Sequence, residues 1–181
     1  YFDQIWASDC SDAYERVSIL KNLALGYPLS VISAHVSDSP NHQTLREIAL
    51  NTRLNVAFFS GGFGYELDIT NLTALEEKQI KQQINYYKEH RDLVVNARYY
   101  LLDNQTAYDR YGFALINRDQ TRAVVALING VSSTLPISEH MPRLALNDKH
   151  TYHVIGFEQT SNLHKFGGLL KMVLPKFIRP D

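Results

Sequence analysis

The chain has 181 residues, of which 45% are apolar and 20% charged, and its formal net charge is −1. This length suits one domain or two small ones, and the apolar share allows a sizeable buried core. With 18 basic and 19 acidic residues, the chain has no basic excess of the kind that phosphate binding requires, so we expect no nucleic-acid partner. No apolar run approaches the roughly 18 residues of a membrane span, so no membrane partner is expected either.

The single cysteine and the first residues bear on the compartment and on the completeness of the chain. Cys10 cannot form a disulfide framework within the chain, which favours a reducing compartment. The start, Tyr1-Phe2-Asp3-Gln4, has neither an initiator methionine nor the basic flank of a signal peptide. The sequence begins in mid-fold, and we therefore expect a fragment of a longer protein.

The first elements are a short strand and a helix. Residues 4–8 predict a strand that ends at a polar cluster over residues 8–12. Asp12 and Glu15 have the spacing of a capping box, which predicts a helix that ends at Gly26-Tyr27-Pro28. Residues 29–36 follow as a compact apolar stretch, which predicts a buried strand.

The next segments continue this alternation. Residues 46–54 predict a short helix or an irregular return, and residues 55–60 predict another buried strand, stopped by a tight turn at Gly61-Gly62-Phe63-Gly64. Thr73 and Glu76 form a second capping box, which predicts a helix to about residue 94. Continuous apolar strands that alternate with helices are typical of parallel β/α units. Three such strands would leave an open sheet edge, so we expect the missing part to lie upstream.

Beyond residue 96 the pattern changes to short β-type segments without helical periodicity. Residues 117–120 predict a hairpin turn between two of them. This half is predicted to be an antiparallel β-sandwich. The segments are residues 99–102, 111–116, 122–128, 151–155 and 169–174.

Two aspartates lie where the first strand meets the first helix. Asp12 is interpreted as the helix N-cap because of its position relative to Glu15. Asp9 lies too early to be the cap, at the carboxyl end of a strand, which is where β/α-barrel enzymes place catalytic groups. Position alone leaves a catalytic and a structural role open for Asp9.

A family resemblance favours the catalytic role. The tract from Trp6 to Ala13, Trp-Ala-Ser-Asp-Cys-Ser-Asp-Ala, with Glu15-Arg16 after it, resembles the Trp-Thr-Ser-Asp-Asp-Thr-Asp-Ala tract of glycoside hydrolase family 36 α-galactosidases. In that family the tract ends the sixth barrel strand, and its first aspartate, the general acid/base, falls on Asp9. Similar blocks follow in family order over the first hundred residues or so. They are Tyr27-Pro28-Leu29-Ser30, Ala34-His35-Val36-Ser37, Pro40-Asn41-His42-Gln43-Thr44, Gly64-Tyr65-Glu66-Leu67-Asp68 and Tyr86-Tyr87-Lys88-Glu89-His90-Arg91.

The chain departs from the family pattern at two places. Cys10-Ser11 replaces the usual Asp-Thr, and residues 45–50 depart from the usual Gly-Arg-x-Thr-Pro-Leu. Both changes leave Asp9 in place, and they bear on the shape of the site and on substrate preference.

The resemblance implies a fold class of α/β followed by all-β. Residues 1–96 would be the last β/α units of an incomplete (β/α)8 catalytic barrel, and residues 97–181 a carboxyl-terminal antiparallel β-sandwich. The implied function is that of a retaining α-galactosidase that hydrolyses terminal α-1,6-linked galactose from melibiose- and raffinose-type oligosaccharides. Asp9 would be its general acid/base, while the nucleophile and most sugar-binding residues would lie upstream. The chain is therefore expected to be inactive alone.

The resemblance further implies no cofactor and no metal, a cytoplasmic setting and a homo-oligomer, commonly a tetramer. Two alternatives remain open. One is galactosyl transfer of the raffinose-synthase kind, because acceptor choice is set by upstream loops. The other is a non-catalytic carbohydrate-binding β-sandwich module, for which residues 1–96 would be only a packing remnant.

Three other candidates have simpler interpretations. His35 and His42 lack a carboxylate or cysteine at metal-ligand spacing, so we interpret them as structural, with His35 a possible neighbour of the site. The glycine-rich residues 61–64 lack the Gly-Lys-Ser/Thr of a phosphate loop. Cys10 would need a histidine base to act as a nucleophile, and the sequence does not supply its position.

Overall fold

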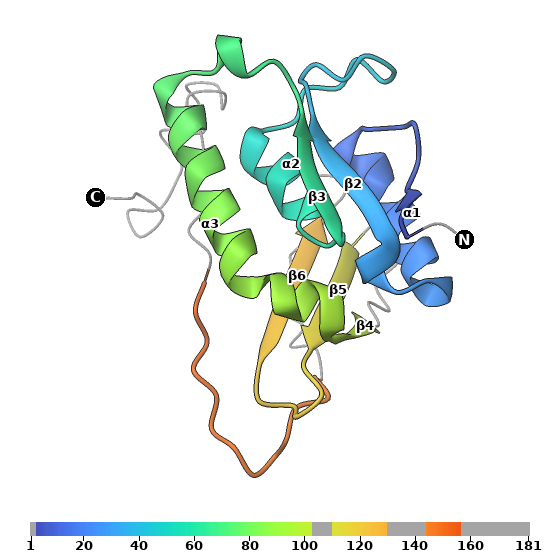
Figure 1. The fold of residues 1–181 in the computed structure, drawn as a ribbon, viewed down its shortest axis with the longest axis vertical. Coiled ribbons are helices and arrows are strands. Elements are labelled where there is room, and N and C mark those ends of the chain that lie inside the picture. Colours follow the sequence, from blue (N-terminus) through green and yellow to red (C-terminus); the bar gives the residue numbers. More distant parts are fainter. Residues whose placement is uncertain (1–2, 103–109, 130–143, 157–181) are drawn as a thin grey trace, which may run out of the picture.

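Two small sheets and three helices form the described part of the protein, which in this computed structural model comprises residues 3–102, 110–129 and 144–156. Figure 1 shows the antiparallel sheet below the parallel strands, with the longest helix, α3, running alongside from top to bottom. The elements are β1 (Ile5–Trp6), α1 (Ala13–Gly26), the short helix η1 (Leu29–Val31), β2 (Ile32–Ser37), α2 (Leu50–Ala57), β3 (Gly62–Glu66), η2 (Ile69–Asn71), α3 (Ala74–Asn96), β4 (Arg98–Leu102), β5 (Arg110–Ile116) and β6 (Ala123–Asn129).

The first sheet is parallel, with the strand order β1-β2-β3. Because side chains alternate along a strand, Ile32, Ala34 and Val36 all point to the helical side, where they are at most 1% exposed. There they pack against apolar residues of α1, α2 and α3. The opposite face carries Trp6 and His35, and Trp6 remains 41% exposed.

The third strand is not where the sequence predicts it. Residues 55–60 were expected to be a buried strand, but α2 runs to Ala57 and the strand β3 begins at Gly62. The apolar run is buried in any case, because Val56 and Phe59 face the core from the end of the helix and the turn after it. A short apolar run has the same pattern in a buried helix end as in a strand, so periodicity alone cannot separate them.

The glycine-rich segment is the strand itself rather than a turn. Phe63 and Tyr65 of β3 pack into the helical core. Gly62 and Gly64, which alternate with them, lie beside side chains of β2, and a Cβ at Gly62 would lie 2.1 Å from the Ser33 hydroxyl oxygen. A Cβ at Gly64 would lie 3.0 Å from the ring of His35. Glycine is therefore required here because side chains of β2 lean across β3.

Both predicted helix starts are confirmed. Asp12 caps α1, and Thr73 caps α3 with a full capping box in which Glu76 bonds back to the cap. Helix α3 runs to Asn96, two residues beyond the predicted end. The predicted strand over residues 29–36 divides into the single turn η1 and the strand β2.

The second sheet is antiparallel, with the strand order β4-β5-β6. Its strands match the predicted segments, and the hairpin closes through the Asn117 N–H, which donates to the Arg122 carbonyl at 3.1 Å. The predicted strand over residues 151–155 is wrong, because that segment is held instead by the Tyr152 hydroxyl, which donates to the Gln120 carbonyl at 2.6 Å. The segment 169–174 lies outside the described residues. The described part therefore contains one antiparallel layer, and the two-layer sandwich stays a prediction.

The two sheets share one hydrophobic core. Phe59, which follows α2, lies with its ring centre 5.8 Å from that of Phe113 on β5. In Figure 1 this contact region is at the end where the parallel strands begin, so their carboxyl ends and the loops that follow point the other way. Within the described ranges, no helix has the length and apolar character needed to cross a membrane.

Gly61, at the entry to β3, offers a test of this packing. Its N–H donates to the Leu29 carbonyl at 2.8 Å, and an added Cβ would meet the Ser30 carbonyl oxygen at 2.5 Å. Because main chain cannot move aside like a side chain, we expect Gly61→Ala to lose about 1–3 kcal/mol of unfolding free energy. Urea unfolding of the chain measures this. The control Gly26→Ala has nothing within 4 Å and should gain or lose less than about 1 kcal/mol, and equal losses in both variants would contradict the packing argument.

Candidate active site

Three polar loops meet at one edge of the parallel sheet. They follow the carboxyl ends of β1, β2 and β3 and comprise residues 7–12, 38–49 and 67–68. The loops after β2 and β3 are joined by the Asp68 N–H, which donates to the Asp38 carboxylate at 3.2 Å. In parallel β/α units this edge is where catalytic groups are placed, so it is the candidate site.

Asp12 organises the first two loops from within. Its side chain is fully buried, and one carboxylate oxygen accepts the N–H groups of Tyr14 and Glu15 at 2.9 and 3.2 Å. The same carboxylate accepts the Thr44 hydroxyl at 2.6 Å and an N–H of the Arg46 guanidinium at 2.6 Å. Burial acts to raise the pKa of Asp12, but the hydrogen bonds and the Arg46 charge outweigh it, and the pKa is lowered. Asp12 is therefore the predicted cap and also an anchor for the second loop.

Ser11 and Asn41 form a second connection between the same loops. The Ser11 carbonyl accepts the Ser37 hydroxyl at 3.0 Å, and the Ser11 hydroxyl accepts the Asn41 side-chain amide at 3.0 Å. The Asn41 side-chain oxygen accepts the N–H groups of Gln43 and Thr44 at 3.0 and 3.1 Å, which is an Asx-type turn. Ser11 and Asn41 thus join the first loop to the second and hold the turn that begins at Asn41.

Asp9 lies on the surface of this arrangement. Its side chain is exposed. It belongs to the loop that follows β1 and ends at the hydrogen-bonded Asp12. Its neighbour Cys10 donates its N–H to the Ser8 hydroxyl at 3.0 Å, which makes a tight bend around Asp9. Arg16 of α1 reaches under the bend and donates to the carbonyls of both Ser8 and Cys10.

His35 and His42 do not form a pair. His35 packs edge-to-face on Trp6, with ring centres 4.7 Å apart, at the carboxyl-terminal half of β2. His42 is exposed in the loop beyond. Over residues 3–102, 110–129 and 144–156, no group of three or more histidine, cysteine or acidic side chains is placed to hold a metal ion.

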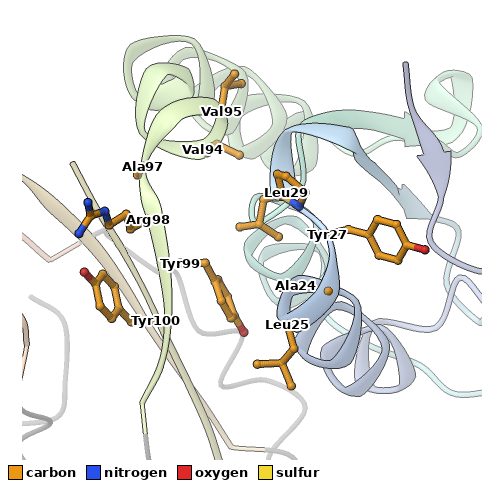
Figure 2. A pocket seen from close by; sticks show the side chains of 12 residues that line it. Ala24, Leu25, Tyr27, Leu29, Val94, Val95, Ala97, Arg98, Tyr99 and Tyr100 are labelled. Carbon is orange, nitrogen blue, oxygen red and sulfur yellow. The ribbon is translucent and has the colours of Figure 1, made fainter. Parts of the chain in front are cut away.

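A groove of about 450 Å³ lies away from this edge. Figure 2 shows it between the end of α1 and β4, where Tyr99 points toward Leu25 while Arg98 and Tyr100 turn to the other side of their strand. Its lining residues contain no carboxyl group, and Leu29 in its wall precedes β2. The groove is therefore at the opposite end of the strands from Asp9 and is not part of the candidate site.

Sequence reasoning found Asp9 and the cap Asp12 but missed the residues that shape the loop. Asn41, Thr44 and Arg16 lie within blocks that carried the family resemblance, yet nothing in their spacing assigned them a partner. Arg46 lies in a segment that departs from the family pattern, and its ion pair with Asp12 spans 34 residues. The Pro40-Asn41 pair was the one local signal, because asparagine after proline favours a turn.

Parallel β/α units that carry an aspartate on a loop after the carboxyl end of a strand are typical of one class of protein, the β/α-type enzymes. Comparison with known families makes this specific. The melibiase family model matches residues 1–97, and the chain belongs to that family.

Similar proteins and solved structures support the same family assignment. Alpha-galactosidase 1 of Pediococcus pentosaceus is 37% identical over 86% of this chain and 21% of its own length. The crystal structure of the GH36 alpha-galactosidase AgaB from Geobacillus stearothermophilus superposes with a TM-score of 0.73 at 38% identity, covering 80% of this chain and 20% of that one. A variant of AgaA from the same organism, in complex with raffinose, gives a TM-score of 0.70 at 38% identity over 75% of this chain and 19% of that one. The expected resemblance to family 36 is confirmed, and the chain spans about a fifth of the length of these relatives.

The Asp12 network predicts a pH dependence of stability. Because the folded-state pKa of Asp12 lies below its ordinary value of 3.8, its carboxylate stabilises the fold above that pH. This contribution is lost as the pH falls through the folded-state pKa. We expect Asp12→Asn to lose about 1–3 kcal/mol of unfolding free energy at pH 7, and the gap to the wild type to narrow toward pH 3.

Urea unfolding at several pH values measures both quantities. The control is Asp92→Asn, which removes an exposed ion pair with Arg122 at 3.4 Å and should cost less than about 1 kcal/mol. A gap for Asp12→Asn that stays constant down to pH 3 would show that its charge does not stabilise the fold.

Proposed function

We propose that this chain is the part of a retaining α-galactosidase that carries the general acid/base, Asp9. The observation that carries the proposal is the place of Asp9 on the loop after β1, in a chain that belongs to the melibiase family. Its relatives are alpha-galactosidases, and one related structure holds raffinose. Because the chain spans about a fifth of their length, the activity belongs to the longer polypeptide.

Two carboxyl groups do the chemistry of a retaining glycosidase. They lie about 5–5.5 Å apart, one as the nucleophile and one as the acid and then the base. Asp9 first donates its proton to the departing glycosidic oxygen. It then takes a proton from the water that hydrolyses the galactosyl-enzyme. The nucleophile, an aspartate on an earlier strand, lies outside these residues. Its negative charge favours the protonated form of Asp9 at the start of the cycle through like-charge repulsion.

The substrate is proposed to be terminal α-1,6-linked galactose of melibiose- and raffinose-type sugars. On the face of the sheet away from the helices, the exposed aromatic ring of Trp6 lies at the end of β1, directly before the loop that carries Asp9. A ring there is suited to pack on a sugar face, as aromatic residues do in carbohydrate sites. The family resemblance alone supports the finer proposals of a cytoplasmic homo-oligomer, commonly a tetramer, and of a β-sandwich over residues 97–181.

Substitution of Asp9 in the complete polypeptide tests its role. We expect Asp9→Ala to lower kcat/KM on raffinose by about 10²–10⁴-fold, because the leaving sugar needs a proton. On an aryl galactoside with an acidic phenol, kcat/KM should fall far less, since that leaving group departs unprotonated. Azide should then raise kcat on the aryl substrate by replacing the water that Asp9 activates.

The matched control is Asp119→Ala, an exposed aspartate of the hairpin between β5 and β6, which should leave both substrates unchanged. Near wild-type turnover of both substrates by Asp9→Ala would make Asp9 a loop residue and end the proposal. Galactose appearing mainly in a larger sugar, rather than free, would shift the reaction to transfer.

The isolated 181-residue chain is expected to show no hydrolysis of an aryl galactoside, because it holds one of the two carboxyl groups. The measurement is phenol release at high chain concentration, with the complete polypeptide as the positive control. Turnover by the chain that disappears in Asp9→Ala would place a nucleophile within these residues.

A further inference from the structure

We propose that Arg16 is a positioning residue that aims the Asp9 carboxyl group at the glycosidic oxygen. The inference deepens the proposed function and rests on the role given there to Asp9. It concerns a side chain of α1 that the proton-transfer chemistry does not itself use.

The geometry of its contacts is specific to Asp9. The Arg16 Nε–H donates to the Cys10 carbonyl at 2.6 Å, and an Nη2–H donates to the Ser8 carbonyl at 2.8 Å. The Ser8 carbonyl lies in the peptide plane directly before Asp9, and the Cys10 carbonyl lies in the plane one residue beyond, so one rigid, planar fork spans the bend. The peptide plane between them, directly after Asp9, is held by the Cys10 N–H, which donates to the Ser8 hydroxyl at 3.0 Å. With the planes on both sides held, the direction of the Asp9 Cα–Cβ bond is set. The Asp9 carboxyl group is exposed and accessible to a substrate, while the main chain that carries it is held in place.

The burial of Arg16 indicates that it serves this loop rather than the stability of the helix. It is 2% exposed, at a position where packing alone would favour an apolar side chain. Its Nε and Nη2 groups donate to main-chain carbonyls, while Nη1 is buried with no hydrogen-bond partner among the described residues. Burying a guanidinium with an unpaired donor is costly, so the arginine is kept here at the expense of stability. The Trp6 ring lies 4.9 Å from the guanidinium carbon and contributes a cation–π contact from the end of β1. The strand β1 and the loop after it thus supply these three contacts of Arg16.

A second arginine, which is partly buried, provides a control with the same kind of hydrogen bonds. Arg53 of α2 donates its Nε–H to the Ile48 carbonyl at 3.0 Å and an Nη1–H to the Ser37 carbonyl. It has the same chemistry as Arg16, a guanidinium bound to two main-chain carbonyls, but it holds the loop after β2. Arg53→Met should therefore loosen a neighbouring loop without changing the direction of Asp9.

The experiment compares Arg16→Met, Arg16→Lys and Arg53→Met in the complete polypeptide. For each variant, kcat and KM are measured on raffinose and on an aryl galactoside with an acidic phenol. We expect Arg16→Met to lower kcat/KM on raffinose by about 10–100-fold, as a misplacement near 1 Å does. The loss should lie in kcat, with KM within about threefold, and kcat/KM on the aryl substrate should change by less than about threefold. Arg16→Lys loses the fork but keeps an N–H donor for one of the two carbonyls, so it should recover part of the loss.

Each other outcome has a definite meaning. Equal losses on the two substrates for Arg16→Met would give Arg16 a structural role only and overturn the inference, as would no loss on either. The same leaving-group selectivity in Arg53→Met would attribute the effect to general loosening and overturn it too. If Arg16→Met does not accumulate as folded protein, Arg16→Lys is judged by the same selectivity. The proposed function fails separately, through Asp9→Ala, which must show leaving-group selectivity for either proposal to stand.

Discussion

The buried carboxylate of Asp12 is the interaction on which the rest of this edge of the protein depends. It caps α1 and accepts hydrogen bonds from Thr44 and Arg46 of the loop after β2. A carboxylate with no exposed surface is stable only while all these donors are present, so the start of the helix and the shape of the second loop are set together. The loop that carries Asp9 lies between β1 and this cap. Asp12 fixes one end, and the Ala7 N–H, which donates to the Ser33 carbonyl at 3.0 Å, fixes the other.

Two arginines, Arg16 buried and Arg53 partly buried, also hold the loops at this edge. Arg16 on α1 and Arg53 on α2 each bind two carbonyls, of which at least one belongs to the loop or strand end that precedes the helix. A helix that packs on the sheet is thereby connected to the residues at the carboxyl end of the strand. In a β/α unit, hydrogen bonds from a packed helix in this way restrict the motion of a loop that has no regular hydrogen bonds of its own.

Local signals predicted the elements whose hydrogen bonds are local. The caps at Asp12 and Thr73 and the hairpin at residues 117–120 were found because each is closed by partners within a few residues. The strand β3 was misplaced because its sequence, Gly-Phe-Gly-Tyr-Glu, is shaped by the Ser33 and His35 side chains of β2. Residues 151–155 failed for a similar reason, since the partner of Tyr152 is the distant Gln120.

The sequence by itself determined the family, the alternation of strands and helices, and the identity of Asp9 as the candidate acid/base, because these depend on residue types in a fixed order. The tertiary structure decided which strand Gly62–Glu66 forms, which loop Arg46 joins to Asp12, and that Arg16 lies beneath Asp9. These contacts join different elements, or a helix to the loop before it. No periodicity or local spacing encodes them, and only the packing of the elements against one another brings the atoms within hydrogen-bonding distance.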